Sequence, residues 1–275
     1  MGVAGRSVGK GEKKQCKMRI AMIKRSKTVH LSVDDTIWIF ENLGHFKYQS
    51  IFEQPVLSFF LRMHKLYGIT VSFYCFGEFQ GLFLNQMTTD YKEQFTANSS
   101  WMRFGFHAAD DKVRYDRESS QKAAHDYANV IHSLGKIVGE EAIDHFVRIH
   151  CYAANIAALR AMREQGLKGC LCGMDQALET YDLGCMQKAL LSRRGSCYDK
   201  RTEMRFLRTD LRMEKISSLE EEVEMIVPRK HLEIFTHEWA LDEICQDKIL
   251  YVCKKMMYSG HRWNFPMEYN KTRST

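Results

Sequence analysis

The chain has 275 residues, of which 45% are hydrophobic and 27% are charged, with 3 prolines and 17 glycines. This composition excludes disordered, collagen-like and small disulfide-stapled proteins and predicts a folded core. The net charge of +6 comes from residues 1–27, where nine lysines and arginines face one acid, while the rest of the chain holds 31 basic and 33 acidic side chains. The excess is therefore a basic arm on a near-neutral body, and a nucleic-acid partner is not favoured.

The cysteines indicate the environment of the protein. Nine of them are scattered through apolar segments, an odd number with no secretory leader ahead of them. We therefore expect a reducing, cytoplasmic environment. No apolar run approaches the roughly 18 residues of a membrane-spanning helix, so no membrane partner is expected. The oligomeric state is not indicated.

Short β-branched or aromatic runs alternate with longer amphipathic stretches, the order typical of repeated βα units. Strands are predicted at 29–33, 69–76, 102–106, 146–151, 167–172, 203–207 and 232–236, and helices at 51–67, 119–139, 153–165 and 241–257. Residues 173–200 give no clear pattern. Because no linker or internal repeat divides the chain, we expect a flexible basic arm at 1–27, one α/β domain at 28–260 and a polar tail at 261–275.

Acidic and histidine side chains recur where the predicted strands end. In parallel α/β folds these ends meet at one mouth, where catalytic groups gather. The polar residues in or just after the strands are Asp34, Asp35, Glu78, His107, Asp110, Asp111, Arg148, His150, His237 and Glu238. Each of these residues, taken alone, could also have a purely structural role, because Asp is a common turn or N-cap residue and a lone His beside acids often forms a surface ion pair.

Five of these residues, at three places in the chain, have a spacing or a position that suggests a metal-binding or catalytic role. Asp34 and Asp35 are adjacent carboxylates, which repel each other unless a cation or a proton separates their roles. His107 and Asp111 are four residues apart, and on a helical turn that spacing directs both toward one metal ion. His237 follows the last predicted strand, and an imidazole there is suited to act as a general acid.

Taken in order, these strand ends resemble the polysaccharide deacetylase family, carbohydrate esterase family 4. The run Leu31-Ser-Val-Asp-Asp-Thr36 is similar to the family's first motif, Phe104-Gly-Phe-His107 to its second and Phe235-Thr-His237 to its last. The resemblance covers roughly residues 29–240 and implies a distorted (β/α) barrel of about seven units. The family's Asp-rich fourth motif is not found, and Thr209-Asp210 is the nearest candidate.

The resemblance also implies roles for single residues. Asp34 would be the general base, oriented by Arg148, and His237 would protonate the leaving amine. Asp35 and His107 would be metal ligands. Two further residues, Glu78 and Trp239, are expected to bind substrate.

The third metal ligand departs from the family pattern. The family has a histidine where this chain has Asp111, and a carboxylate there still permits zinc as the expected divalent metal. A second anion would, however, shift the preference toward a harder ion.

The implied function is that of a metal-dependent hydrolase that removes an acyl group, such as acetyl, from an N-acetylated sugar or a similar small substrate. Two alternatives stay open. The first is an inert barrel that binds a saccharide or small ligand, which Asp111 and the missing fourth motif favour. The second is a glycoside hydrolase that uses two carboxylates about 5–9.5 Å apart without a metal.

Overall fold

The computed structural model describes residues 27–173 and 180–268. The basic arm expected at 1–27 therefore lies outside the described residues except for Lys27, as does the end of the expected polar tail, residues 269–275. Within the described ranges, no helix combines the length and the apolar character that crossing a bilayer requires.

The first half of the chain alternates strands with helices. Its elements, with 3-10 helices marked η, are β1 (Lys27–Thr36), α2 (Trp38–Phe46), η1 (Ile51–Glu53), α3 (Pro55–Tyr67), β2 (Val71–Phe76), β3 (Glu78–Phe79), β4 (Leu82–Phe83), η2 (Leu84–Gln86), α4 (Lys92–Ala97), β5 (Met102–Ala108), α5 (Ser120–Val138), η3 (Glu140–Ala142), β6 (Ile143–Asp144), β7 (Phe146–Val147), η4 (His150–Tyr152), α6 (Ile156–Glu164) and β8 (Gly169–Cys172).

The second half continues the alternation. Its elements are α7 (Cys185–Arg194), β9 (Ser196–Asp199), β10 (Met204–Arg208), β11 (Leu211–Arg212), η5 (Met213–Lys215), α8 (Leu219–Ile226), β12 (His231–His237), η6 (Glu238–Ala240), α9 (Glu243–Tyr258), β13 (His261–Trp263) and η7 (Pro266–Glu268).

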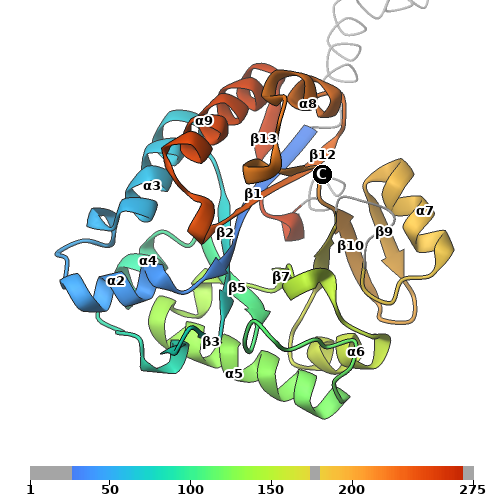
Figure 1. Cartoon of the computed structure of the whole chain (residues 1–275), viewed down its shortest axis with the longest axis horizontal. Helices are drawn as coiled ribbons and strands as arrows, with labels where there is room; N and C mark the ends of the chain where they lie inside the picture. Colours follow the sequence, from blue (N-terminus) through green and yellow to red (C-terminus); the bar gives the residue numbers. More distant parts are fainter. Residues whose placement is uncertain (1–26, 174–179, 269–275) are drawn as a thin grey trace, which may run out of the picture.

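Two sheets together form a distorted (β/α) barrel with helices around the outside (Figure 1). One sheet has the order β11-β12-β1-β2-β5-β6, with β13 also paired to β1, and the other has the order β7-β8-β10-β9. The sheets adjoin where β6 and β7 are separated by one residue, and again where β10 leads into β11. At this second junction Asp210 bonds the backbone of Glu233 in β12 through both its N–H and its carboxylate.

The strands pair in parallel apart from β9 with β10 and the small β3–β4 hairpin. Every residue of β2 is buried, as expected of a parallel strand covered on both faces. At the centre of β5 a glycine is required, because a Cβ on Gly105 would lie 2.8 Å from the carbonyl oxygen of Asp144. Because β1, β2 and β5 pair in parallel, their carboxyl ends lie at one edge.

Most predicted elements are present, with two differences that matter for the site. The strand expected at 146–151 ends at Val147, after which the chain turns into η4. The helix α2 was not predicted.

The domain boundary expected at residue 260 is also corrected. Strand β13 pairs with the beginning of β1, and the side chains of Trp263 and Phe265 are buried, so the fold includes residues to at least 265.

Candidate active site

The end of β1 is irregular, and this irregularity places two adjacent carboxylates at the mouth. The pairing of β1 with β2 shifts register between Val33 and Thr36, and Asp35 has a φ of 57° in the left-handed region. Successive side chains of a regular strand point to opposite faces. The bulged geometry instead lets both Asp34 and Asp35 act electrostatically on His107.

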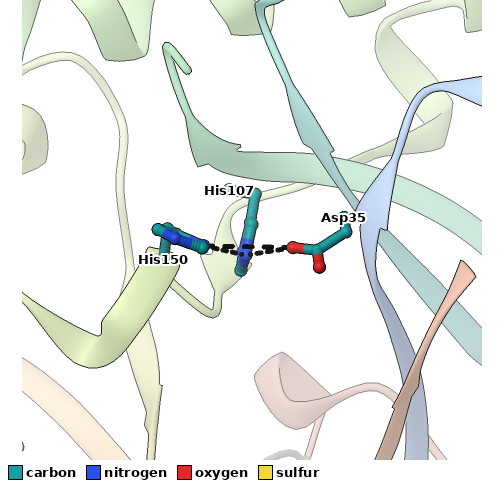
Figure 2. A group of neighbouring side chains, drawn as sticks. All are labelled: Asp35, His107 and His150. Carbon is teal, nitrogen blue, oxygen red and sulfur yellow. Dashed lines mark hydrogen bonds and ion pairs between the residues drawn. The ribbon is translucent and has the colours of Figure 1, made fainter. Parts of the chain in front are cut away.

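Asp35, His107 and His150 form a group of three converging side chains (Figure 2). Nε2 of His107 lies 3.2 Å from Oδ1 of Asp35 and 3.2 Å from Nδ1 of His150, and the last two atoms are 3.9 Å apart. The three residues come from β1, β5 and η4, so the fold, and not local sequence, assembles them.

The donor set fits a divalent metal. Nδ1 of His107 bonds the carbonyl oxygen of Arg148 at 2.6 Å, and because a carbonyl can only accept, this nitrogen carries the proton and directs the lone pair of Nε2 into the group. Oδ1 of Asp35 is buried and accepts no hydrogen bond of good geometry. Ligands about 2.1 Å from a tetrahedral zinc are about 3.4 Å apart, close to the separations seen here.

The electrostatics of the group favour the cation-binding forms of Asp35 and His150. Burial alone would raise the pKa of Asp35, but its contact with His107 and the charges of His107 and His237 hold that pKa well below its usual value. Burial opposes the charged form of His107, yet Asp35 and Asp34 raise its pKa. Burial and the charge of His107 lower the pKa of His150 to about 4. Near pH 7 the carboxylate of Asp35 is therefore ionised and the imidazole of His150 is neutral, and these are the forms that coordinate a metal.

Asp34 is held by a buried arginine. Nη1 of Arg148 donates to Oδ1 of Asp34 at 2.9 Å and to Ser32 at 2.6 Å, and its Nη2 donates to Thr209 at 3.1 Å. Arg148 also lies over the ring of Phe235, 4.1 Å from the centroid. This ion pair fixes one oxygen of Asp34, and no donor among the described residues bonds the other.

His237 is hydrogen-bonded by Glu214 of η5 through the ring nitrogen that lies away from Asp35. Its Nδ1 lies 2.5 Å from Oε1 of Glu214, while its Nε2 lies 4.0 Å from Oδ2 of Asp35. Burial would raise the pKa of Glu214, but the hydrogen bond and charge of His237 lower it to about 2. An ionised Glu214 can only accept, so Nδ1 of His237 carries a proton and Nε2 faces the mouth.

The structure does not place Asp111 with Asp35, His107 and His150. His107 lies in β5, not on a helical turn, and the carboxylate of Asp110 bonds the backbone N–H groups of Lys112 and Val113 to form a turn. The four-residue spacing therefore does not bring Asp111 to His107, and its exposed side chain acts on His150 only through its charge. His150 stands in the group instead.

The two expected substrate-binding residues lie in different surroundings. Nε1 of Trp239 donates to Oδ2 of Asp35 at 2.8 Å, which places this side chain at the site. Oε1 of Glu78 accepts from the N–H of Gly81 at 3.0 Å, so this carboxylate closes its own hairpin.

Sequence reasoning gave no role to two residues of the site. His150 follows Arg148 by two residues, and that spacing, which places side chains on one face of a strand, was the available signal. Glu214 lies four residues after Asp210, but Asp210 binds Arg208 and Arg229 instead of facing His237. No local pattern distinguishes Glu214 from the other acids.

Several solved structures have a fold similar to that of this chain. The chain is similar to a chitin deacetylase from the fungal pathogen Colletotrichum lindemuthianum, with a TM-score of 0.51, 10% identity and coverage of 90% of this chain and 88% of that one. A Streptococcus mutans CE4 esterase matches with a TM-score of 0.50, 11% identity and coverage of 90% and 89%. A 4-alpha-glucanotransferase from Thermococcus litoralis matches with a TM-score of 0.57 and 10% identity, over 90% of this chain and 40% of that chain.

No protein-family model and no curated protein matches the sequence. The resemblance to the polysaccharide deacetylases is thus confirmed at the level of the fold. Because the glucanotransferase shares the fold, the reaction has to be inferred from the site.

Proposed function

We propose that this protein is a metal-dependent hydrolase that removes an acyl group, such as acetyl, from nitrogen on an N-acetylated sugar or a similar small substrate. The observation that carries the proposal is the convergence of Asp35, His107 and His150, with His237 beside them. Two imidazoles and one carboxylate are a donor set typical of catalytic zinc, so zinc is the proposed metal.

The proposed chemistry divides the two adjacent aspartates between two tasks. Asp35, with His107 and His150, would hold the cation, which lowers the pKa of coordinated water toward about 7 and polarises the acyl oxygen. Asp34 accepts the proton of the attacking water on the oxygen that Arg148 leaves free. The Arg148 ion pair fixes the direction of the Asp34 carboxylate.

His237 completes the reaction as the general acid. Glu214 holds the proton on Nδ1, so Nε2 delivers a second proton to the departing nitrogen when the ring is charged. Trp239 at the rim, and Glu78 on its hairpin, are proposed to contact the substrate.

Elemental analysis of the purified protein tests the metal centre. We expect about one zinc per chain in the wild type and loss of zinc in Asp35→Ala and in His107→Ala. Zinc retained in both variants would contradict the assignment of ligands.

Deacetylation of acetylated sugars then tests the chemistry. Asp34→Asn should keep its zinc and lose turnover by about 100-fold or more, because general base catalysis contributes on that scale. Unchanged turnover in this variant would exclude Asp34 as the base. A wild type that holds zinc but deacylates no substrate would favour the inert barrel, and hydrolysis of a glycoside after chelation would favour the metal-free reading.

A further inference from the structure

Trp239 has contacts that substrate binding alone does not explain. It lies in η6, directly after β12, and its side chain is 57% exposed. The indole N–H bonds Asp35, and the ring stacks on His237 with centroids 5.0 Å apart and an interplanar angle of 26°. One side chain therefore contacts both a proposed metal ligand and the proposed general acid.

The two oxygens of Asp35 have separate surroundings. Oδ1 faces His107 and His150, at 3.2 Å and 3.9 Å. Oδ2 receives the indole N–H at 2.8 Å and lies 4.0 Å from Nε2 of His237. The indole thus occupies the oxygen that points away from the group and leaves the other oxygen free to bind a cation.

The backbone on both sides of this contact is fixed. Oε2 of Glu238, the residue before Trp239, accepts from the N–H groups of Ile37 and Trp38 at 2.8 Å and 3.1 Å. This carboxylate ties η6 to the chain that follows Asp35. The indole is therefore anchored close to its hydrogen-bond partner although most of its surface is exposed.

We propose that Trp239 is a positioning residue, which holds Asp35 as a ligand through Oδ1 alone and keeps the ring of His237 beside it. This inference rests on the proposed metal centre. Groups that bond the outer atom of a metal ligand restrict its orientation, and their removal commonly weakens metal binding by 10- to 100-fold. The face of the indole away from His237 stays available to a substrate ring.

The test measures zinc affinity, which needs no turnover. We would compare the wild-type chain with Trp239→Phe, which keeps an aromatic ring but has no N–H donor, by competition with a chromogenic chelator. We expect zinc to dissociate about 10-fold more readily from Trp239→Phe. The matched control is Trp38→Phe, which removes an indole that meets Phe79 edge to face and makes no hydrogen bond to Asp35, and its zinc affinity should match the wild type.

The outcomes separate this inference from the proposed function. If the wild type binds zinc and Trp239→Phe binds it with the same affinity, Trp239 has no positioning role, and the proposed metal centre is unaffected. A raised KM with unchanged zinc affinity overturns it in the same way and makes Trp239 a substrate contact only. A wild type that binds no zinc overturns the metal centre and this inference together. Matching circular dichroism spectra and melting temperatures would establish that the variants are folded.

Discussion

At the scale of single residues, the site depends on Asp35 adopting a backbone conformation that most side chains avoid. Its φ of 57° lies in the left-handed region, which aspartate tolerates better than bulky or β-branched residues. Such conformations cost on the order of 1–3 kcal/mol and concentrate at functional sites. The adjacent carboxylates, repulsive in isolation, are accommodated because Arg148 neutralises Asp34 and the two imidazoles face Asp35.

The first prediction concerns the third metal ligand. His150→Ala should weaken zinc binding by at least about 100-fold, because it removes a proposed direct ligand, and the loss of a group that only bonds a ligand already costs up to that much. Asp111→Ala should leave zinc affinity near the wild-type value, since that side chain is exposed outside the group. Equilibrium dialysis of the two variants measures both constants. The reverse order would restore Asp111 as the ligand.

The second prediction concerns Glu214. Its lowered pKa of about 2 keeps it anionic at any working pH, so it accepts the Nδ1 proton of His237 and leaves Nε2 facing the mouth. Glu214→Gln removes the negative charge, and its amide can turn either an oxygen or an N–H toward Nδ1, so we expect kcat to fall about 10- to 100-fold with KM near the wild-type value. Steady-state kinetics with an acetylated sugar measures both constants. A lower melting temperature with unchanged kcat would mean that Glu214 is only structural.

The residues of the site differ in how far sequence could reveal them. Asp34, His107 and His237 each follow or end a strand whose apolar pattern is recognisable, and the rule that strand ends meet placed them together. Glu214 and Trp239 depend on contacts across more than 20 and 200 residues respectively. Asp111 was favoured because its spacing fits a helical turn, and the chain forms a different turn there.

At the scale of elements, tertiary contacts outweigh local propensity where the site needs them. The run Val-Arg-Ile-His-Cys-Tyr has strong β-propensity, but β7 ends at Val147, and Cys151 and Tyr152 both have a φ of 54°. That turn places His150 beside Asp35 and His107. The helix α2 has no side-chain cap from its own N-cap residue, and its first N–H groups are bonded by Glu238, about 200 residues away. Local sequence shows neither feature.

The third prediction follows from Glu238 at the start of α2. Burial outweighs its backbone hydrogen bonds and raises its pKa from 4.5 to about 7. Between pH 4.5 and about pH 7 the carboxyl group of Glu238 is mostly protonated in the folded protein and mostly ionised in the unfolded chain. The contribution of Glu238 to the free energy of unfolding is therefore full below about pH 4.5 and is lost as the pH rises through 7, a change on the order of 3 kcal/mol.

Urea unfolding of the metal-free protein at pH 5 and pH 8 measures this effect. Other groups titrate in the same range, so the informative quantity is the difference between the wild type and Glu238→Gln at each pH. Gln cannot ionise, so the wild type should lose stability relative to this variant between pH 5 and pH 8. A constant difference would show that Glu238 does not titrate in this range.

At the scale of the whole molecule, the two ends of the barrel hold different groups of polar side chains. The site lies at the carboxyl ends of β1, β5 and β12, whereas a buried polar network lies nearer their beginnings. In that network His30 bonds Glu233 and Ser72, each at 2.9 Å, and Ser72 donates to Asp144 at 2.5 Å. Parallel barrels commonly divide stability and function in this way.

The order of βα units could be predicted for most of the chain, apart from residues 173–200, because each unit has its own hydrophobic periodicity. The packing of the C-terminal segment on the barrel could not be predicted. It depends on β13 pairing with β1, and on Phe265, which is fully buried close to His30 and under the guanidinium of Arg103. The segment after Gly260 is short and polar in composition, so nothing in its pattern separates it from a tail.

The fourth prediction tests whether the C-terminal segment stabilises the fold. Phe265→Ala removes a buried ring from the amino-terminal end of the barrel and should lower the free energy of unfolding by roughly 3–5 kcal/mol. In a domain of this size that corresponds to a fall in melting temperature of roughly 6–20 °C, measured by calorimetry. Met267→Ala is the matched control, because its side chain is 41% exposed and should contribute little. Since Phe265 lies away from the mouth, its removal should leave zinc affinity at 25 °C unchanged; an equal loss of affinity and stability would mean that the two ends of the barrel are coupled.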